Sequence, residues 1–204
     1  MFQIIRAAGW PIWPLLVASL IALSIIVERA WSLQRSKVAP RDLLERIAQE
    51  VKRKGVTQEL LDRLSQGTLL ARVFAAGLRN VKSSRDVMRE SLEEAGRVAV
   101  HELERFLTSL GTIASLAPIM GLFGTVVGMI EIFGAQSSAG MSGNPQQLAH
   151  GISVALYNTA FGLIVAIPSM IFYRHYRAKV DLLVVDMEAE ATKLVEIVHD
   201  ERST

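Results

Sequence analysis

Two long runs of apolar residues dominate the pattern of hydrophobic and polar positions along this chain. No charged side chain occurs between Phe106 and Ile130, or between Gly151 and Tyr173. At about 1.5 Å per residue, either run is long enough to cross a hydrocarbon core of about 30 Å. The pattern predicts two membrane-spanning helices, over residues 106–133 and 150–173, with a connecting loop over residues 134–149.

A third apolar run lies near the N-terminus. It follows Trp10 and Trp13, extends to Val27 and ends where charged residues begin. Tryptophan is enriched at membrane interfaces, so its position fits one end of a span. A cleavable signal peptide fits less well, because only Arg6 precedes the run and no small-residue cleavage site follows it. We predict a first membrane-spanning helix within residues 1–31.

The distribution of lysine and arginine predicts the orientation of the spans. The loop over 134–149 has neither residue, and only Arg6 precedes the first span. Because basic residues accumulate on the cytoplasmic side, we expect the N-terminus and this loop outside, and residues 32–105 and 174–204 in the cytoplasm. The basic residues on the cytoplasmic side of the spans are Arg29, Arg35, Lys37, Arg41, Arg97, Arg105, Arg174, Arg177 and Lys179.

The region between the first two spans is patterned as short amphipathic helices. Two are expected over 41–53 and 57–66, with Thr57 as the N-cap of the second, and a third from about Thr68 to Arg79. Ser83, with an acidic residue three positions later, resembles a capping arrangement for the next helix.

The second and third spans are expected to continue beyond the membrane. The helical period of apolar residues predicts one uninterrupted helix from about Arg85 to Phe133, and another through Arg174 to about His199. Apolar stripes outside the membrane need partners, so a cytoplasmic bundle is implied. The predicted fold class is all-α: a polytopic membrane protein with three transmembrane helices, two of them extended into a cytoplasmic helical bundle.

Small residues recur at helical spacing along both charge-free runs. Helices in a bilayer associate through close packing of such residues, so these stripes are expected to face protein. Packing does not explain the polar residues Thr125, Asn158, Thr159 and Glu131. The stripes comprise Ala114, Pro118, Gly121, Gly124, Thr125 and Gly128 in the first run, and Gly151, Ala155, Thr159, Gly162, Ala166 and Ser169 in the second.

The sequence offers no chemistry typical of an enzyme. It has no cysteine, no phosphate-binding loop and no pairing of nucleophile and base. His101, His175 and His199 lack a second ligand at a supporting spacing, so neither a metal nor a cofactor is expected. The net charge of +2 and the basic residues at helix ends favour a topological role over nucleic-acid binding.

Two sequence blocks carry a resemblance to a known family. The first is Ala117-Pro118, Gly121 to Val126 and Gly128. The second is Gly151-Ile152, Ala155-Leu156, Thr159-Ala160, Gly162-Leu163 and Ala166-Ile167-Pro168. In order and spacing these blocks resemble the core of the ExbB/TolQ/MotA proton-channel family, nearest to its ExbB branch. With the three-span layout, the resemblance covers nearly the whole chain.

The resemblance implies a subunit of a proton-driven motor in the bacterial inner membrane. Five copies would surround a dimer of an ExbD-like single-span protein with an essential membrane Asp. Proton flow would energise TonB-dependent transport through a TonB-like protein, with a periplasmic N-terminus and a cytoplasmic C-terminus. Thr125 and Thr159 match the family's pore-lining threonines, and Asn158 and Glu131 are the other candidates for the ion pathway.

Three alternatives stay open at this point. The chain resembles TolQ as well, which implies an envelope-maintenance subunit. A membrane scaffold that does not conduct ions is a second possibility. The third concerns Thr125 and Thr159, since a threonine hydroxyl in a span often bonds the carbonyl four residues earlier in its own helix.

One position departs from the family pattern. Relatives commonly carry Glu five residues before the threonine of the third span, and that position here is Val154. This chain instead has Glu131, six residues after Thr125. If the two threonines are level, the carboxylate has moved to the neighbouring helix at similar depth. Glu131 also shares a stripe with Gly124 and Gly128, so it is expected to face protein. The alternative is that Glu131 marks the wet outer end of the second span.

Overall fold

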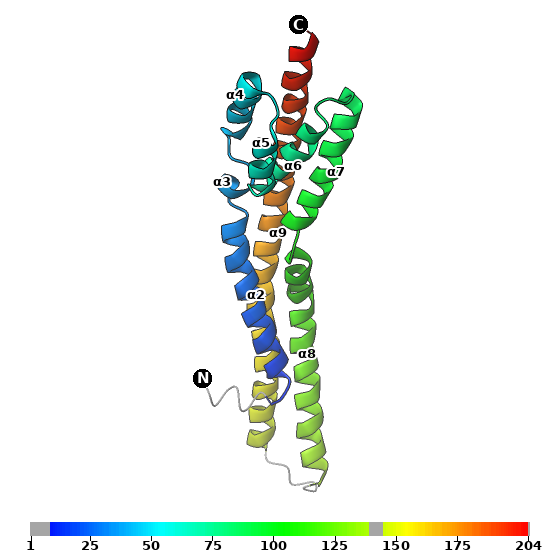
Figure 1. Ribbon diagram of the computed structural model, residues 1–204. Helices are drawn as coiled ribbons and strands as arrows, with labels where there is room; N and C mark the ends of the chain where they lie inside the picture. The colour runs from blue at the N-terminus through cyan, green and yellow to red at the C-terminus, as the bar shows by residue number, and fades with distance from the viewer. Residues whose placement is uncertain (1–8, 139–144, 204) are drawn as a thin grey trace. The chain divides into compact units, whose positions relative to one another are not determined.

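The computed structural model describes residues 9–138 and 145–203, and over these residues every regular element is a helix. The helices are α2 (Ile12–Ser32), α3 (Arg35–Val38), α4 (Leu43–Lys54), α5 (Gln58–Ser65), α6 (Leu69–Arg79), α7 (Arg85–Leu103), α8 (Leu107–Ser138) and α9 (Pro145–Ser203), labelled in Figure 1. Three helical stretches are long and apolar enough to cross a membrane: α2, one within Arg85–Gly134 and one within Gly151–His199. The all-α, three-span fold class is confirmed.

The chain divides into two compact units. The spanning unit takes in the chain up to Glu28 together with Phe106–His175, and the polar unit takes in Arg29–Arg105 together with the chain from Tyr176 onwards. Both α2 and α9 contribute residues to each unit.

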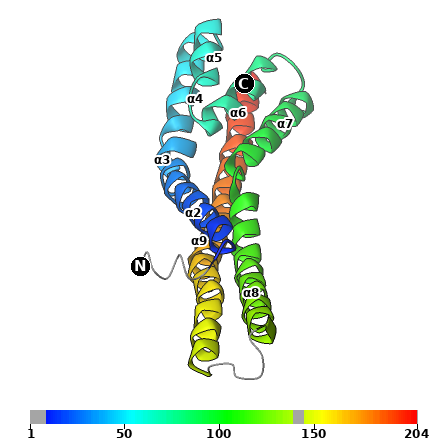
Figure 2. The same cartoon turned by 90° about the horizontal axis from the view of Figure 1, so that it is seen from below.

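The spanning unit is built on α8 and α9, which lie side by side in the successive views (Figure 2). Its core joins Leu15 of α2 to Ala117 of α8 and to Val165 and Ala166 of α9. The large apolar side chains of α8 instead point outward: Ile119 is 60% exposed and Ile130 is 67% exposed. A helix pair that buries small residues and exposes large ones is typical of a structure surrounded by lipid or by further helices.

The polar unit has a conventional core of large apolar side chains. Phe74 and Leu78 of α6 and Met88 of α7 are completely buried. Hydroxyl caps begin the helices: Thr57 accepts from the Leu60 amide and Thr68 accepts from the Ala71 amide. The helices expected over 41–53, 57–66 and 68–79, and the Thr57 cap, are confirmed.

Two details of the polar unit differ from the sequence expectation. The residue that caps α7 is Ser84, whose hydroxyl accepts from the Val87 amide, and not Ser83. The short helix α3 was not predicted, because four residues are too few to show a period.

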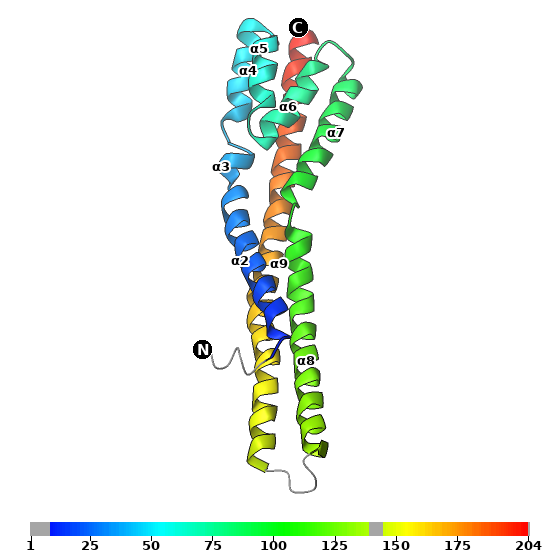
Figure 3. The same cartoon turned by 60° about the horizontal axis from the view of Figure 1, so that its bottom comes forward.

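The uninterrupted helix expected from Arg85 to Phe133 is wrong. Helix α7 ends at Leu103 and α8 begins at Leu107, so the ribbon is interrupted between them (Figure 3). Phe106 has φ 63°, a left-handed conformation that costs a residue other than glycine about 1–2 kcal/mol. At the end of α7, Nη1 of Arg29 donates to the Leu103 carbonyl at 3.1 Å.

Helices α8 and α9 also extend further at their loop ends than the sequence predicted. Helix α8 continues to Ser138 and α9 begins at Pro145, so both enter the region 134–149 that was expected to be a loop. The centre of that loop, 139–144, lies outside the described residues. The expected continuation of the third span to about His199 is confirmed by α9.

Candidate ion-pathway site

The candidate site lies where α8 and α9 approach most closely. A Cβ atom on Gly162 would lie 2.5 Å from the Ala117 carbonyl oxygen and 3.1 Å from the Gly121 Cα. On Gly128, it would lie 3.1 Å from the Ala155 Cβ. The backbones can come this close because these positions lack larger side chains. The structure brings together most of the residues singled out as packing positions: Gly121, Gly124, Gly128, Gly151, Ala155, Gly162 and Ala166.

Asn158 lies at the centre of this contact. Its side chain is packed against Gly124, where a Cβ atom would approach the Asn158 Cβ and Cγ to 2.8 Å, and its backbone oxygen faces Gly121. The residue is 1% exposed. The absence of a side chain at Gly124 leaves room for this carboxamide between α8 and α9. Asn158 is therefore enclosed between the helices and not exposed on the surface of this chain.

The two threonines differ in their surroundings. The Thr125 hydroxyl donates to the Leu122 carbonyl of its own helix at 2.6 Å, which is the local type of bond, made three residues back. Thr159 packs its Cα against Gly121. Since Gly124 faces Asn158 and Gly128 faces Ala155, Thr125 is level with residues near Tyr157. The threonines are thus offset by about two residues, or about 3 Å along the axis.

The same register fixes the depths of Val154 and Glu131. Gly128 faces Ala155, and Gly151 packs against Ile132, where an added Cβ would lie 2.6 Å from the Ile132 Cδ1. Glu131 therefore lies about two residues further toward the loop than Val154, a difference of about 3 Å. Within this chain Glu131 is exposed, whereas the shared stripe predicted that it faces protein.

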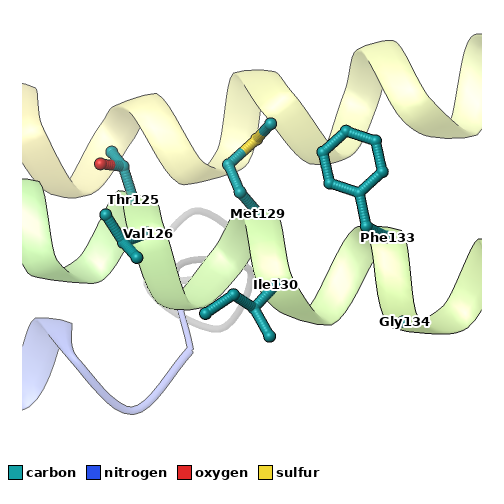
Figure 4. A pocket seen from close by; sticks show the side chains of 6 residues that line it. All are labelled: Thr125, Val126, Met129, Ile130, Phe133 and Gly134. Atoms are coloured by element: carbon teal, nitrogen blue, oxygen red, sulfur yellow. The ribbon is translucent and has the colours of Figure 1, made fainter.

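An open groove follows the exposed side of α8 beside Thr125. Its volume is about 610 Å³, and Figure 4 shows Thr125, Met129 and Phe133 leaving the helix on one side and Val126 and Ile130 on the other. Gly134 completes the lining. Met129 and Phe133 were missed by sequence reasoning, although their spacing of four residues places them in line with Thr125. The groove is mainly apolar, with the Thr125 hydroxyl as its polar side chain.

No group of three or more potential metal ligands occurs in the part of the chain that the structure describes. The arrangement is a close-packed helix pair with one buried carboxamide and two threonines, one of which opens onto an apolar groove. Such a surface can accept a further helix and can exchange hydrogen bonds with a polar group on it.

Comparison with known proteins identifies the relatives of this arrangement. Residues 65–189 match the model of the MotA/TolQ/ExbB proton channel family. An ExbB-like biopolymer transport protein of Synechocystis is 30% identical over 84% of this chain and 82% of its own length. The biopolymer transport protein ExbB of Aquifex aeolicus is 37% identical, with 65% of this chain and 90% of that protein covered.

A TolQ protein is similar to the chain as well. The Tol-Pal system protein TolQ of Pseudomonas aeruginosa is 32% identical, covering 62% of this chain and 59% of that protein. The family match includes α8 and the part of α9 that packs against it, where Thr125, Asn158 and Thr159 lie. By its sequence and its three apolar helices, the chain belongs to the MotA/TolQ/ExbB proton channel family.

Proposed function

We propose that this chain is the ExbB-like subunit of a proton-driven motor in the bacterial inner membrane. Five copies surround a dimer of an ExbD-like single-span protein, which carries the membrane Asp, and a TonB-like protein transmits the work. The N-terminus is periplasmic and the C-terminus cytoplasmic. The ExbB proteins among the relatives support this assignment, and the charge-free loop 134–149 supports the orientation.

The observation that carries the proposal is the polar set in an otherwise uncharged helix pair. From Phe106 to Ile130 and from Gly151 to Tyr173 the spans hold no Asp, Glu, His, Lys or Arg. Polar groups inside a bilayer are costly and usually functional. Hydroxyls can hydrogen-bond a carboxyl group in both its protonation states, but the titrating group itself must come from a partner.

The groove beside Thr125 supports the same assignment. It is open, apolar and lies along a helix, which suits the transmembrane helix of the single-span partner. The Thr125 hydroxyl donates to the Leu122 carbonyl, so it remains an acceptor for a protonated partner carboxyl. To donate to the ionised carboxylate, the hydroxyl rotates away from Leu122.

Replacement of both threonines by valine tests this role. Thr125→Val with Thr159→Val keeps the side-chain shape, so the complex should still assemble, while proton flux into vesicles containing the chain and its partner should fall at least tenfold. Thr112→Val is the matched control, because Thr112 also bonds its own helix, at the Thr108 carbonyl. Wild-type flux in the double variant would remove the threonines from the pathway.

A TolQ-like role is the second candidate, favoured by the similarity to the Pseudomonas protein. Deletion of the gene separates the two roles by phenotype: loss of TonB-dependent uptake supports the ExbB-like assignment, and a leaky outer membrane supports the TolQ-like one. A scaffold that does not conduct requires neither a gradient nor a partner carboxylate. If function survives complete collapse of the proton gradient, the scaffold is correct and the motor is not.

Glu131 is proposed as an outer-end carboxylate of the pathway. Its exposure and its position about 3 Å beyond the level of Val154 suit proton exchange with water at the mouth of the path. Glu131→Gln should lower proton flux several-fold without abolishing it, and addition of Val154→Glu should restore part of it. Full flux in Glu131→Gln would leave Glu131 as an ordinary helix-end residue.

A further inference from the structure

Residues 104–106 form the joint between α7 and α8, and the sequence around this joint favours an uninterrupted helix. No proline or glycine occurs between Arg97 and Leu110, and the residues around the joint are good helix formers. Yet Phe106, with its aromatic side chain, holds a left-handed φ of 63°. Glycine is the residue that takes this conformation without strain. The sequence around Phe106 therefore favours a helix, but its backbone is left-handed. Such a disagreement indicates that contacts with other parts of the chain set the conformation of Phe106.

The hydrogen bonds at the joint identify that contact. In an uninterrupted helix the amide of Leu107 would donate to the Leu103 carbonyl. Because α8 begins only at Leu107, this carbonyl has lost its helical donor, and the Arg29 guanidinium donates to it at 3.1 Å instead. A cation at the C-terminal end of α7 is also favoured by the helix dipole.

Arg29 is buried at this position. The residue is 5% exposed, and the neighbouring Leu33 is completely buried. A buried guanidinium needs hydrogen-bond acceptors, and a helix-end carbonyl is a strong one. The break at the joint leaves the Leu103 carbonyl available as an acceptor, and the buried arginine takes the place of its helical donor.

We infer that Arg29 is a positioning residue that selects between two states of the α7–α8 joint. With Arg29 on the Leu103 carbonyl, the helix is broken at Phe106. With Arg29 withdrawn, the Leu107 amide takes the carbonyl and α7 and α8 join as one helix. Arg29 belongs to α2, so a movement of the first span sets the conformation at the start of the helix that carries Thr125. This inference does not depend on a partner or on proton conduction.

The distance across the joint tests the two states. The chain has no cysteine, so spin labels can be attached to cysteines placed at Val98 and Thr112, both exposed. An uninterrupted helix separates these positions by about 21 Å at about 1.5 Å per residue. The labelled full-length chain, with Arg29 in place, is diluted into unlabelled chain in lipid nanodiscs. Its main distance should differ from the value of about 21 Å expected for an uninterrupted helix. Arg29→Met should raise the population near 21 Å at least fivefold.

Glycine at the joint provides the decisive counter-test. Phe106→Gly removes the strain of the broken state, so the double variant Arg29→Met with Phe106→Gly should return toward the wild-type distance. A general loosening by Arg29→Met would broaden the distribution and would not be reversed by glycine. Arg35→Met is the matched control, since Arg35 forms an exposed ion pair with Asp186 at 3.0 Å and should leave the distance unchanged.

Amide exchange at Leu107 gives an independent measurement. The amide should exchange at least tenfold more slowly in Arg29→Met, because it becomes hydrogen-bonded to Leu103. If Arg29→Met does not fold, Phe106→Ile alone, with Arg29 present, should slow this exchange, because a β-branched residue disfavours the left-handed conformation of the broken state. An unchanged distance distribution in a folded Arg29→Met protein, or an unchanged Leu107 exchange rate in Phe106→Ile, overturns the two-state joint.

Discussion

The spanning unit and the polar unit differ in the kind of side chain that packs in their interiors. In the spanning unit the contact between α8 and α9 depends on residues that are small: Gly162 faces the Ala117 carbonyl, and Gly124 leaves room for Asn158. In the polar unit the core consists of residues that are large, such as Phe74 and Met88, supported by helix caps. Water drives apolar burial in the second case, whereas lipid offers no such drive and leaves close packing to act alone.

This difference predicts opposite sensitivities to mutation. Removal of side-chain volume should damage the polar unit, and addition of volume should damage the spanning unit. Gly77 is the informative exception, since a Cβ atom there would lie 2.6 Å from the Leu92 Cδ2. The polar unit therefore contains one position of the kind that is common in the spanning unit, but its neighbour is a flexible side chain and not backbone.

The largest effect is expected from Phe74→Ala. Phe74 is completely buried, so the cavity should lower the free energy of unfolding by about 3–5 kcal/mol. Thermal unfolding of the purified chain, followed by circular dichroism, measures the loss. Ile130→Ala removes a large apolar side chain that is 67% exposed and should change the midpoint little. Equal losses in the two variants would contradict the proposed contrast.

A smaller loss, about 1–3 kcal/mol, is expected from Gly162→Ala, because the added methyl group meets backbone atoms that cannot rotate away. The same thermal measurement applies. Gly134→Ala is the matched control in α8, since a Cβ atom there has no neighbour within 4 Å. Tolerance of alanine at Gly162 would show that α8 and α9 do not depend on close approach.

The smallest effect concerns the cap of α7. Ser84→Ala removes the acceptor of the Val87 amide and should cost about 1 kcal/mol. Ser83→Ala should be nearly neutral, because the adjacent hydroxyl does not cap the helix. Chemical denaturation of the two variants gives the comparison directly. If Ser83→Ala proves the more damaging, the helix begins one residue earlier than the structure shows.

Much of this architecture could be predicted from the sequence, because each element has a local cause. Charge-free runs indicated the three spans, and Thr57 marked the start of α5. The break at Phe106 could not be predicted, because the sequence around it favours a helix and the hydrogen bond at the end of α7 comes from Arg29, which is distant in the chain. Ser83 was preferred over Ser84 because Asp86 follows it three positions later, as in a capping arrangement.

The candidate site was predicted less completely than the fold. The glycine stripes pointed to close packing, but the depth of Asn158 depends on the register of two helices, which no single helix encodes. The same register separates Glu131 from the level of Val154. The Thr125 bond to Leu122 shows that the local alternative and a position on an open groove are compatible in one residue.

The continuity of α9 has a mechanical consequence. An unbroken α-helix resists twisting along its length, so a turn applied near Pro145 is passed on as a turn beyond Arg174. Pro168 removes one internal hydrogen bond and permits bending there, but the chain remains helical on both sides. The path through α8 and α7 differs, because the helix is interrupted between Leu103 and Leu107 and Phe106 there has a left-handed φ. A twist is therefore carried along α9 by an unbroken row of helical hydrogen bonds, whereas between α7 and α8 that row is interrupted.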